Sequence, residues 1–153
     1  MKTLTKLLSP NDVGYTRTHQ AGILVPKYGG FLEFFPQLDT REYNPDAMVT
    51  FIDPAGRRWD FRFIYYNNSF FHGTRNEYRL TRMTGFFREF DAEPGDGLVL
   101  SVIGNKYYAR IVSAPGEAAP GEEIADSVPD IIVPHKTIRL VFDQNWNLIE
   151  SEE

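Results

Sequence analysis

The sequence predicts a mainly β protein, a barrel or a sandwich, from three observations. Short runs of β-branched and aromatic residues recur along the chain, turn residues separate these runs at regular intervals, and few stretches carry a helical period. At 153 residues the chain is long enough to bury one core without disulfides. We therefore expect a single β-rich domain with one or two short helices.

The clearest expected element is a hairpin in the first half of the chain. Ala47–Asp53 reads as a strand, Asp53–Gly56 as a tight turn and Arg57–Tyr66 as a second strand. Within the second strand, every second residue from Trp59 to Tyr65 is aromatic. This period of two is typical of a strand that buries one face.

The remaining elements are shorter or less regular. Gly29–Leu38 places apolar residues on one face of a short helix that ends near Pro36. Gly104-Asn105 is expected to form the two-residue turn of a second hairpin. Asn67–Arg88 shows no clean period. The further expected strands are Ala21–Pro26, Leu98–Ile103, Tyr107–Val112 and Ile138–Phe142. The expected core comprises Ile23, Val25, Phe34, Val49, Phe51, Phe61, Phe63, Leu100 and Ile111.

The composition divides the chain into three parts. Residues 1–113 contain the expected barrel core, and residues 114–127 read as a flexible loop or linker because Ala114–Glu123 consists of Ala, Pro, Gly and Glu. Residues 128–153 are either the last strand of the barrel or the lead-in to a further, catalytic domain. The sequence leaves both alternatives open.

The net charge of −5 is unevenly distributed. From Ser113 onward there are two basic residues against nine acidic ones, and the rest of the chain has 14 basic against 12 acidic residues, a net charge of +2. Between Ala55 and Phe90 there are seven arginines and three acids. A basic middle section suits a polyanionic partner, although an uneven ordinary surface gives the same counts.

Several function classes lack their sequence signatures. The absence of cysteine excludes disulfides and cysteine-based zinc sites, and no run approaches the roughly 18 apolar residues of a membrane span. No lysine follows an acidic residue by two positions, so the Asp/Glu-x-Lys element of common metal-dependent nucleases is absent. No phosphate-binding glycine loop is present, and His19, His72 and His135 lack metal-ligand spacing. We therefore expect no catalytic site.

Two polar segments carry side chains suited to DNA. His72–Arg82 contains arginines that can bond guanine in a fork, an asparagine suited to adenine and a glutamate that can accept from cytosine. Tyr15–Gln20 also mixes a cation with hydrogen-bonding side chains. Chemistry alone favours simpler structures over DNA contacts: a solvated, salt-bridged strand or loop for His72–Arg82 and an exposed loop for Tyr15–Gln20.

Taken in order, several short segments resemble a known family. The most specific is Thr74-Arg-Asn-Glu-Tyr-Arg-Leu-Thr-Arg82. The others are Leu8-Ser-Pro-Asn-Asp-Val-Gly14, Thr18-His-Gln-Ala-Gly-Ile23, Pro26, Phe35-Pro36, Arg41-Glu-Tyr-Asn-Pro45 and Tyr65-Tyr-Asn67. Together they are similar to the N-terminal effector domain of EcoRII-type restriction endonucleases, from about Leu8 to about Val102.

The resemblance implies a DNA-binding pseudobarrel, an open β-barrel shared with plant B-three-type transcription factors. It implies that two arms grip the major groove of double-stranded DNA at the pseudopalindrome CCWGG, where W is A or T. The domain would serve a fused or separate nuclease in the bacterial cytoplasm as its recognition or effector module. Binding would need no cofactor, since Mg²⁺ would serve only a catalytic domain that this chain lacks. Two unlike arms would allow one monomer to grip the site.

The same resemblance assigns roles to individual residues. Arg75 and Arg79 would read guanines, Glu77 a cytosine amino group, and His19 and Asn76 the remaining base edges. The expected contacts to the DNA backbone are Arg17, Thr18, Gln20, Thr74, Tyr78, Arg82 and Arg88.

The chain departs from the family at two positions, because Gly73 and Tyr78 stand where the family has lysines. Fewer cations would weaken phosphate attraction or shift a base contact. Two other function classes stay open at this point: a β-barrel module for protein interaction, and a nuclease with an unfamiliar site.

Overall fold

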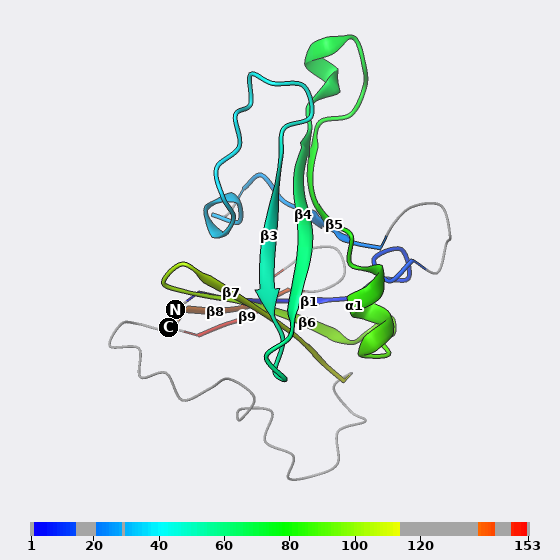
Figure 1. Cartoon of the computed structure of the whole chain (residues 1–153), viewed down its shortest axis with the longest axis vertical. Helices are drawn as coiled ribbons and strands as arrows, with labels where there is room; N and C mark the ends of the chain where they lie inside the picture. The colour runs from blue at the N-terminus through cyan, green and yellow to red at the C-terminus, as the bar shows by residue number, and fades with distance from the viewer. Residues whose placement is uncertain (1, 15–20, 29, 114–137, 143–147, 153) are drawn as a thin grey trace.

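The strands of this protein form one sheet with two groups, and the strands of one group cross those of the other at a steep angle (Figure 1). The structure is a computed structural model of residues 1–153, and it describes all of them except residues 1, 15–20, 29, 114–137, 143–147 and 153. In the described part the strand order is β2-β5-β4-β3-β7-β6-β1-β8-β9. The expected fold class, a mainly β open barrel, is confirmed.

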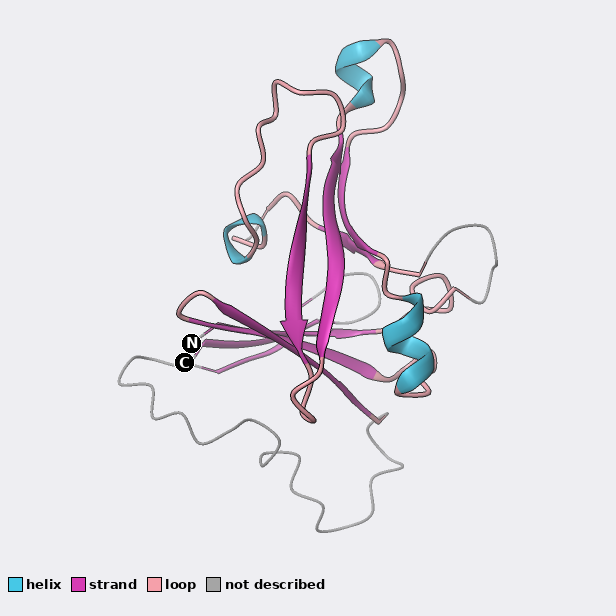
Figure 2. Cartoon of the chain, in the orientation of Figure 1, coloured by secondary structure: helices cyan, strands magenta, loops and turns pink. Residues whose placement is uncertain are grey.

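The elements have the following bounds. The strands are β1 (Lys2–Leu7), β2 (Ile23–Val25), β3 (Asp46–Ile52), β4 (Arg58–Tyr66), β5 (Glu77–Thr81), β6 (Gly97–Ile103), β7 (Lys106–Val112), β8 (Ile138–Phe142) and β9 (Leu148–Glu152). The helical elements are the 3₁₀ turns η1 (Leu32–Phe34) and η2 (Asn68–Phe71) and the helix α1 (Thr84–Glu89). Figure 2 shows how small their share of the fold is. None of the described helices is long and apolar enough to cross a membrane.

The predicted hairpin is present as β3 and β4, paired antiparallel from Asp46↔Ile64 to Ile52↔Arg58. Asp53 closes the turn, because its carboxylate accepts hydrogen bonds from the backbone N–H groups of Ala55 (2.8 Å) and Arg57 (3.0 Å). The same carboxylate accepts from the Trp59 indole N–H at 2.9 Å. Gly56 has a φ of +83°, a conformation that favours glycine and completes the turn.

The predicted core is largely confirmed. Eight of its nine members are buried, and Ile111 packs against them while partly exposed. Aromatic rings dominate the interior: Phe35 stacks on Phe63 with ring centroids 4.5 Å apart, and Phe51 lies 5.1 Å from Phe61. Offset ring pairs of this kind add to the stabilisation that burial itself provides.

Sequence patterns did not reveal the regular structure between Asn67 and Arg88, which contains η2, β5 and α1. In β5 only Tyr78 and Leu80 face the core, and two apolar residues that alternate with Glu77, Arg79 and Thr81 are too few to establish a period. The helix expected over Gly29–Leu38 is the single 3₁₀ turn η1. Strand β1, which pairs antiparallel with β6, was also not anticipated.

The C-terminal part of the chain contributes strands to the same sheet. β8 pairs parallel with β1 from Lys2↔Ile138 to Lys6↔Phe142, and β9 pairs antiparallel with β8. The linker expected over residues 114–127 lies outside the described residues. β8 therefore lies beside the N-terminal strand, although it is far from it in sequence.

A lysine lies inside this apolar framework. Lys6 on β1 is 2% exposed and forms an ion pair with Asp12, whose side chain is 7% exposed. Asp12 also accepts from the Ser9 N–H at 2.9 Å, and its own carbonyl accepts from the Gly22 N–H at 3.0 Å. The pair therefore ties the end of β1 to both ends of the segment that contains residues 15–20.

The buried ion pair gives a prediction about stability. Lys6→Met should lower the free energy of unfolding by about 3–5 kcal/mol, because it leaves the Asp12 carboxylate buried without its cation. The double variant Lys6→Met/Asp12→Asn should recover part of that loss. Urea denaturation measures both, with Arg41→Ala as the control, since Arg41 pairs with Asp39 at the surface with 89% exposure and should change the midpoint little. A double variant no more stable than the single one would contradict the assignment.

The Asp53 turn gives a prediction about pH. Burial alone would raise the pKa of Asp53, but the hydrogen bonds from Trp59, Arg57 and Ala55 and the charge of Arg57 lower the pKa below its ordinary value of 3.8. Its contribution is therefore complete above about pH 4 and is lost as the pH falls through the lowered pKa. Asp53→Asn should cost about 1.5–3 kcal/mol at pH 7 and progressively less in acid.

Urea midpoints of the wild type and of Asp53→Asn at pH 7, 4 and 2.5 test this expectation. A stability difference that stays constant across the three pH values would show that the ionised carboxylate is not what holds the turn.

Candidate nucleic-acid interface

The register of β5 decides which side chains share a face. β5 lies between β2 and β4, and its pairs with β4 include Tyr66↔Glu77, Ile64↔Arg79 and Arg62↔Thr81. Successive residues of a strand point to opposite faces. Glu77, Arg79 and Thr81 therefore lie on one face together with Arg62 and Tyr66 of β4, and Tyr78 and Leu80 face the core.

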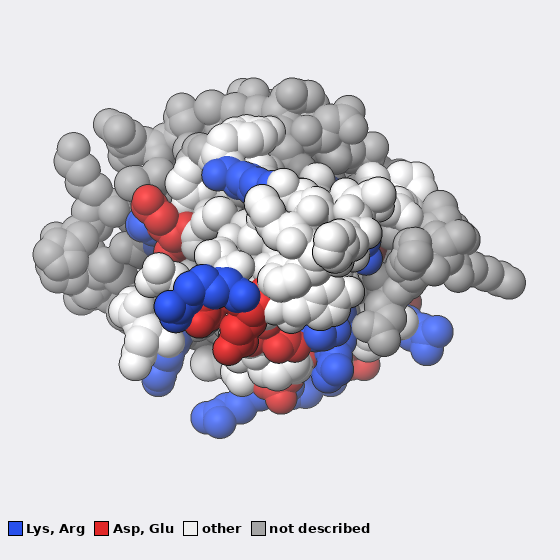
Figure 3. Space-filling view, turned by 90° about the horizontal axis from the view of Figure 1, so that it is seen from above, with Lys and Arg blue, Asp and Glu red and all other residues white. Residues whose placement is uncertain are grey.

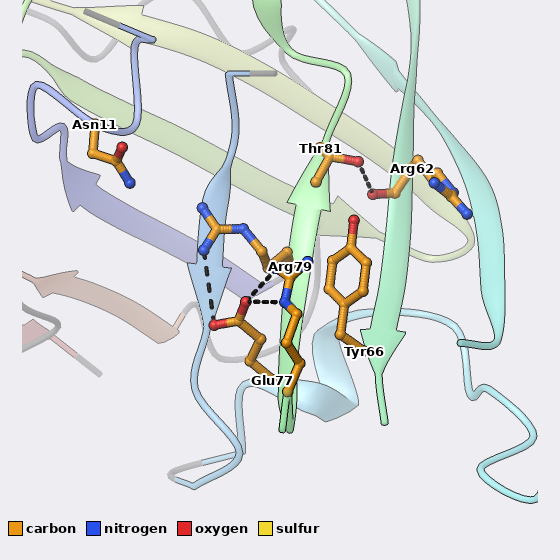
Figure 4. A pocket seen from close by; sticks show the side chains of 7 residues that line it. Asn11, Arg62, Tyr66, Glu77, Arg79 and Thr81 are labelled. Carbon is orange, nitrogen blue, oxygen red and sulfur yellow. Dashed lines mark hydrogen bonds and ion pairs between the residues drawn. The ribbon is translucent and has the colours of Figure 1, made fainter. Parts of the chain in front are cut away.

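An open groove of about 640 Å³ lies on this polar face (Figure 4). Asn11, from the turn that precedes residues 15–20, lies across it from the two strands. The residues that line the groove are Asn11, Arg62, Tyr66, Arg75, Glu77, Arg79 and Thr81. The groove thus brings part of the predicted His72–Arg82 segment together with Asn11, whereas the predicted Tyr15–Gln20 segment lies outside the described residues.

Inside the groove, Glu77 lies between two arginines. Arg75 donates from Nη2 (2.5 Å) and Nε (3.2 Å) to Oε1 of Glu77, and Arg79 Nη1 lies 3.9 Å from Oε2. Arg62 forms a separate pair with Asp46, with Nε 2.6 Å from Oδ2. Three guanidinium groups thus accompany two carboxylates, and Figure 3 shows acidic side chains set among basic ones on the face seen from above.

Tyr66 completes the arrangement around Arg75. The Arg75 guanidinium carbon lies 3.6 Å from the centre of the Tyr66 ring, close enough for a cation–π contact. Sequence reasoning missed both Tyr66 and Arg62. The alternation in β4 was visible, but only the pairing of β4 with β5 shows that its polar face adjoins Arg75 and Arg79.

The loop between β4 and β5, residues 67–76, is held by hydrogen bonds to residues 40–42 and by hydrogen bonds within the loop. At its base, Asn67 is fully buried and donates to the carbonyls of Thr40 (3.2 Å) and Glu42 (2.6 Å). Higher up, the Asn68 side chain accepts from the Arg75 N–H at 2.6 Å, and the Asn68 carbonyl accepts from the Gly73 N–H at 2.6 Å. The loop therefore presents Arg75 from a defined backbone position.

The packing of this loop leaves no room for a side chain at Gly73. A Cβ at this position would lie 2.8 Å from Cγ of Asn68 and 2.9 Å from its carbonyl oxygen, closer than side chains normally approach. A lysine at position 73 would have to displace Asn68, which holds the backbone of Arg75. Glycine at position 73 therefore permits the close packing of this loop.

Exposed aromatic side chains mark the outer end of the same loop. Phe70 is 71% exposed, and the Tyr43 ring, itself 60% exposed, meets the Phe71 ring edge-on with centroids 5.4 Å apart. Tyr43, Phe70 and Phe71 were not predicted as site residues from the sequence.

The other predicted site residues are dispersed. Asn76 accepts from the Tyr65 hydroxyl at 2.6 Å and from Lys27. Thr74, Arg82 and Arg88 are exposed, Arg82 directly after β5 with a φ of +62° and Arg88 in the last turn of α1. Arg17, Thr18, His19 and Gln20 lie outside the described residues.

Tyr78 is separated from the groove. Its ring stacks on Tyr65 with centroids 4.1 Å apart, on the core-facing side of β5. Burial raises the pKa of the Tyr78 hydroxyl, and the electrostatic interaction with Tyr65 raises it further. The predicted backbone contact of Tyr78 therefore does not share a face with Glu77 and Arg79.

The described residues offer no alternative centre for metal chemistry. No group of three or more His, Cys, Asp or Glu side chains among them is placed to hold a metal ion. The chemistry that the groove does offer is hydrogen bonding and ion pairing through arginine, glutamate and threonine side chains.

Comparisons with known proteins agree with this geometry. The curated type II restriction enzyme EcoRII of Escherichia coli is 43% identical over 81 residues, which cover 50% of this chain and 20% of that enzyme. Among solved structures, the Arabidopsis FUS3–DNA complex has a TM-score of 0.54 at 20% identity and covers 72% of this chain and 95% of that chain. The second likeness concerns the fold alone, and the first spans about a fifth of its relative.

The family described as "Restriction endonuclease EcoRII, N-terminal" matches residues 1–113. This range includes β1 to β7 and every residue that lines the groove. The chain therefore belongs to the family of the N-terminal domain of restriction endonuclease EcoRII.

Proposed function

We propose that this chain binds double-stranded DNA at a short specific sequence, as the recognition or effector domain of a type II restriction endonuclease. The observation that carries the proposal is the groove on β4 and β5, where Arg75 and Arg79 flank Glu77 beside a loop built to present them. The family membership supports the same role. Such a role belongs in the bacterial cytoplasm, where the DNA is.

The groove side chains suit base edges in the major groove. Arginine forms a bidentate pair with guanine O6 and N7, and a carboxylate accepts from the cytosine amino group. Arg75 and Arg79 would each take a guanine, and Glu77 would take the cytosine amino group. Oε2 of Glu77 lies 3.9 Å from Arg79, beyond hydrogen-bond distance, so this oxygen retains acceptor capacity for a base.

Two segments of the chain would enter the major groove. One is the 67–76 loop, with Thr74 and Asn76. The other is the segment of residues 15–20, with His19 as its base contact and Arg17, Thr18 and Gln20 on the backbone. Exposed Arg82 and Arg88 would anchor phosphates. With the family as guide, CCWGG is the proposed target, and the catalytic step would belong to a nuclease domain outside this chain.

Replacing single arginines separates base reading from phosphate binding. Arg75→Ala should weaken binding to a CCWGG duplex by about 1–3 kcal/mol and change binding to a scrambled duplex little. Arg82→Ala should weaken both alike and reduce the slope of log K against log salt by about one. Fluorescence anisotropy titrations at several salt concentrations measure these constants, in EDTA because the proposed binding would need no metal. Equal losses on both duplexes for Arg75→Ala would refute its role as a base reader.

A further inference from the structure

The cross-strand position of Tyr66 places its ring under Arg75. Tyr66 of β4 pairs directly with Glu77 of β5, and Arg75 precedes Glu77 by two residues. The guanidinium carbon of Arg75 consequently lies 3.6 Å from the ring centre while its Nε and Nη2 bond to Glu77. The register of the two strands therefore brings a flat platform and a charged acceptor to the same arginine.

The two bonds to Glu77 do not by themselves orient the guanidinium. Both end on the same oxygen, Oε1, so the plane of the group can turn about that single point. The other oxygen, Oε2, faces Arg79. The Tyr66 ring, 3.6 Å from the guanidinium carbon, restricts the remaining rotation, because moving the guanidinium away from the ring loses the cation–π attraction.

We propose that Tyr66 is a positioning residue for DNA recognition: it fixes the plane of the Arg75 guanidinium before DNA binds. This inference rests on the proposed function. Glu77 occupies the edge formed by Nε and Nη2, so the edge formed by Nη1 and Nη2 is presented to a bidentate acceptor such as guanine. An arginine that is already ordered loses less side-chain freedom on binding, which strengthens binding where its partner base is present.

The free protein provides the first test. In ¹⁵N relaxation measurements, the Nε–Hε group of Arg75 should be ordered in the wild type and in Tyr66→Phe, which keeps the ring. It should become mobile in Tyr66→Leu. Tyr108→Leu, which removes a partly buried tyrosine from β7, is the matched control and should leave Arg75 unchanged. An Arg75 that stays equally ordered in Tyr66→Leu overturns the proposal, and thermal midpoints recorded for each variant confirm that it is folded.

Binding to DNA provides the second test. Tyr66→Leu should weaken binding to the CCWGG duplex about three- to tenfold and binding to a scrambled duplex less than about twofold. In an Arg75→Ala background, the same Tyr66→Leu change should have almost no further effect on the CCWGG duplex. If the loss is the same with and without Arg75, Tyr66 acts on DNA by another route and its positioning role in recognition is refuted.

The two measurements separate this inference from the function on which it rests. A wild type that shows no preference for CCWGG, while Tyr66 still orders Arg75, would overturn the proposed target and leave the positioning contact established. A wild type that prefers CCWGG while Arg75 is mobile would overturn the inference and leave the proposed function standing.

Discussion

The groove depends on the pairing of β5 with β4, which sets Glu77 opposite Tyr66 and Arg79 opposite Ile64. Because side chains alternate along a strand, a slip of one residue would turn Glu77 and Arg79 into the core and expose Leu80. The core prevents that slip: Leu80 is fully buried, and Tyr78 stacks on Tyr65. Hydrophobic packing on one face therefore fixes the polar arrangement on the other.

The interface is not a simple positive surface. Carboxylates accompany the arginines of the groove, and the chain as a whole has a net charge of −5. Each carboxylate lowers the general attraction to phosphate but restricts where a neighbouring guanidinium can point. Under the proposed function, a base that offers no donor to Glu77 would be disfavoured, so this carboxylate would help to select among DNA sequences. The groove is accordingly suited to discrimination more than to long-range attraction.

The part of the fold that was predictable is the part where one face of a strand is uniformly apolar. Alternating aromatic residues and the turn residues after Asp53 predicted the β3–β4 hairpin. β5 was missed because Glu77, Arg79 and Thr81 alternate with only two core residues, a run too short to establish a period. Arg75, Glu77 and Arg79 were predicted as site residues from their chemistry and from the resemblance, and they line one groove. Tyr66 was not, since its role arises from a contact across strands that no local pattern contains.

The 67–76 loop is held by hydrogen bonds and close packing at Asn68. Asn68 bonds the backbone at both Gly73 and Arg75, and the close approach at Gly73 leaves no room for a Cβ. A lysine there would add charge but would loosen the loop that holds Arg75. Under the proposed function, charge would act on every DNA sequence alike, whereas the position of Arg75 would act only where its partner base is present. Glycine at this position permits the close packing that holds the Arg75 backbone, and Tyr66 and Glu77 hold its guanidinium.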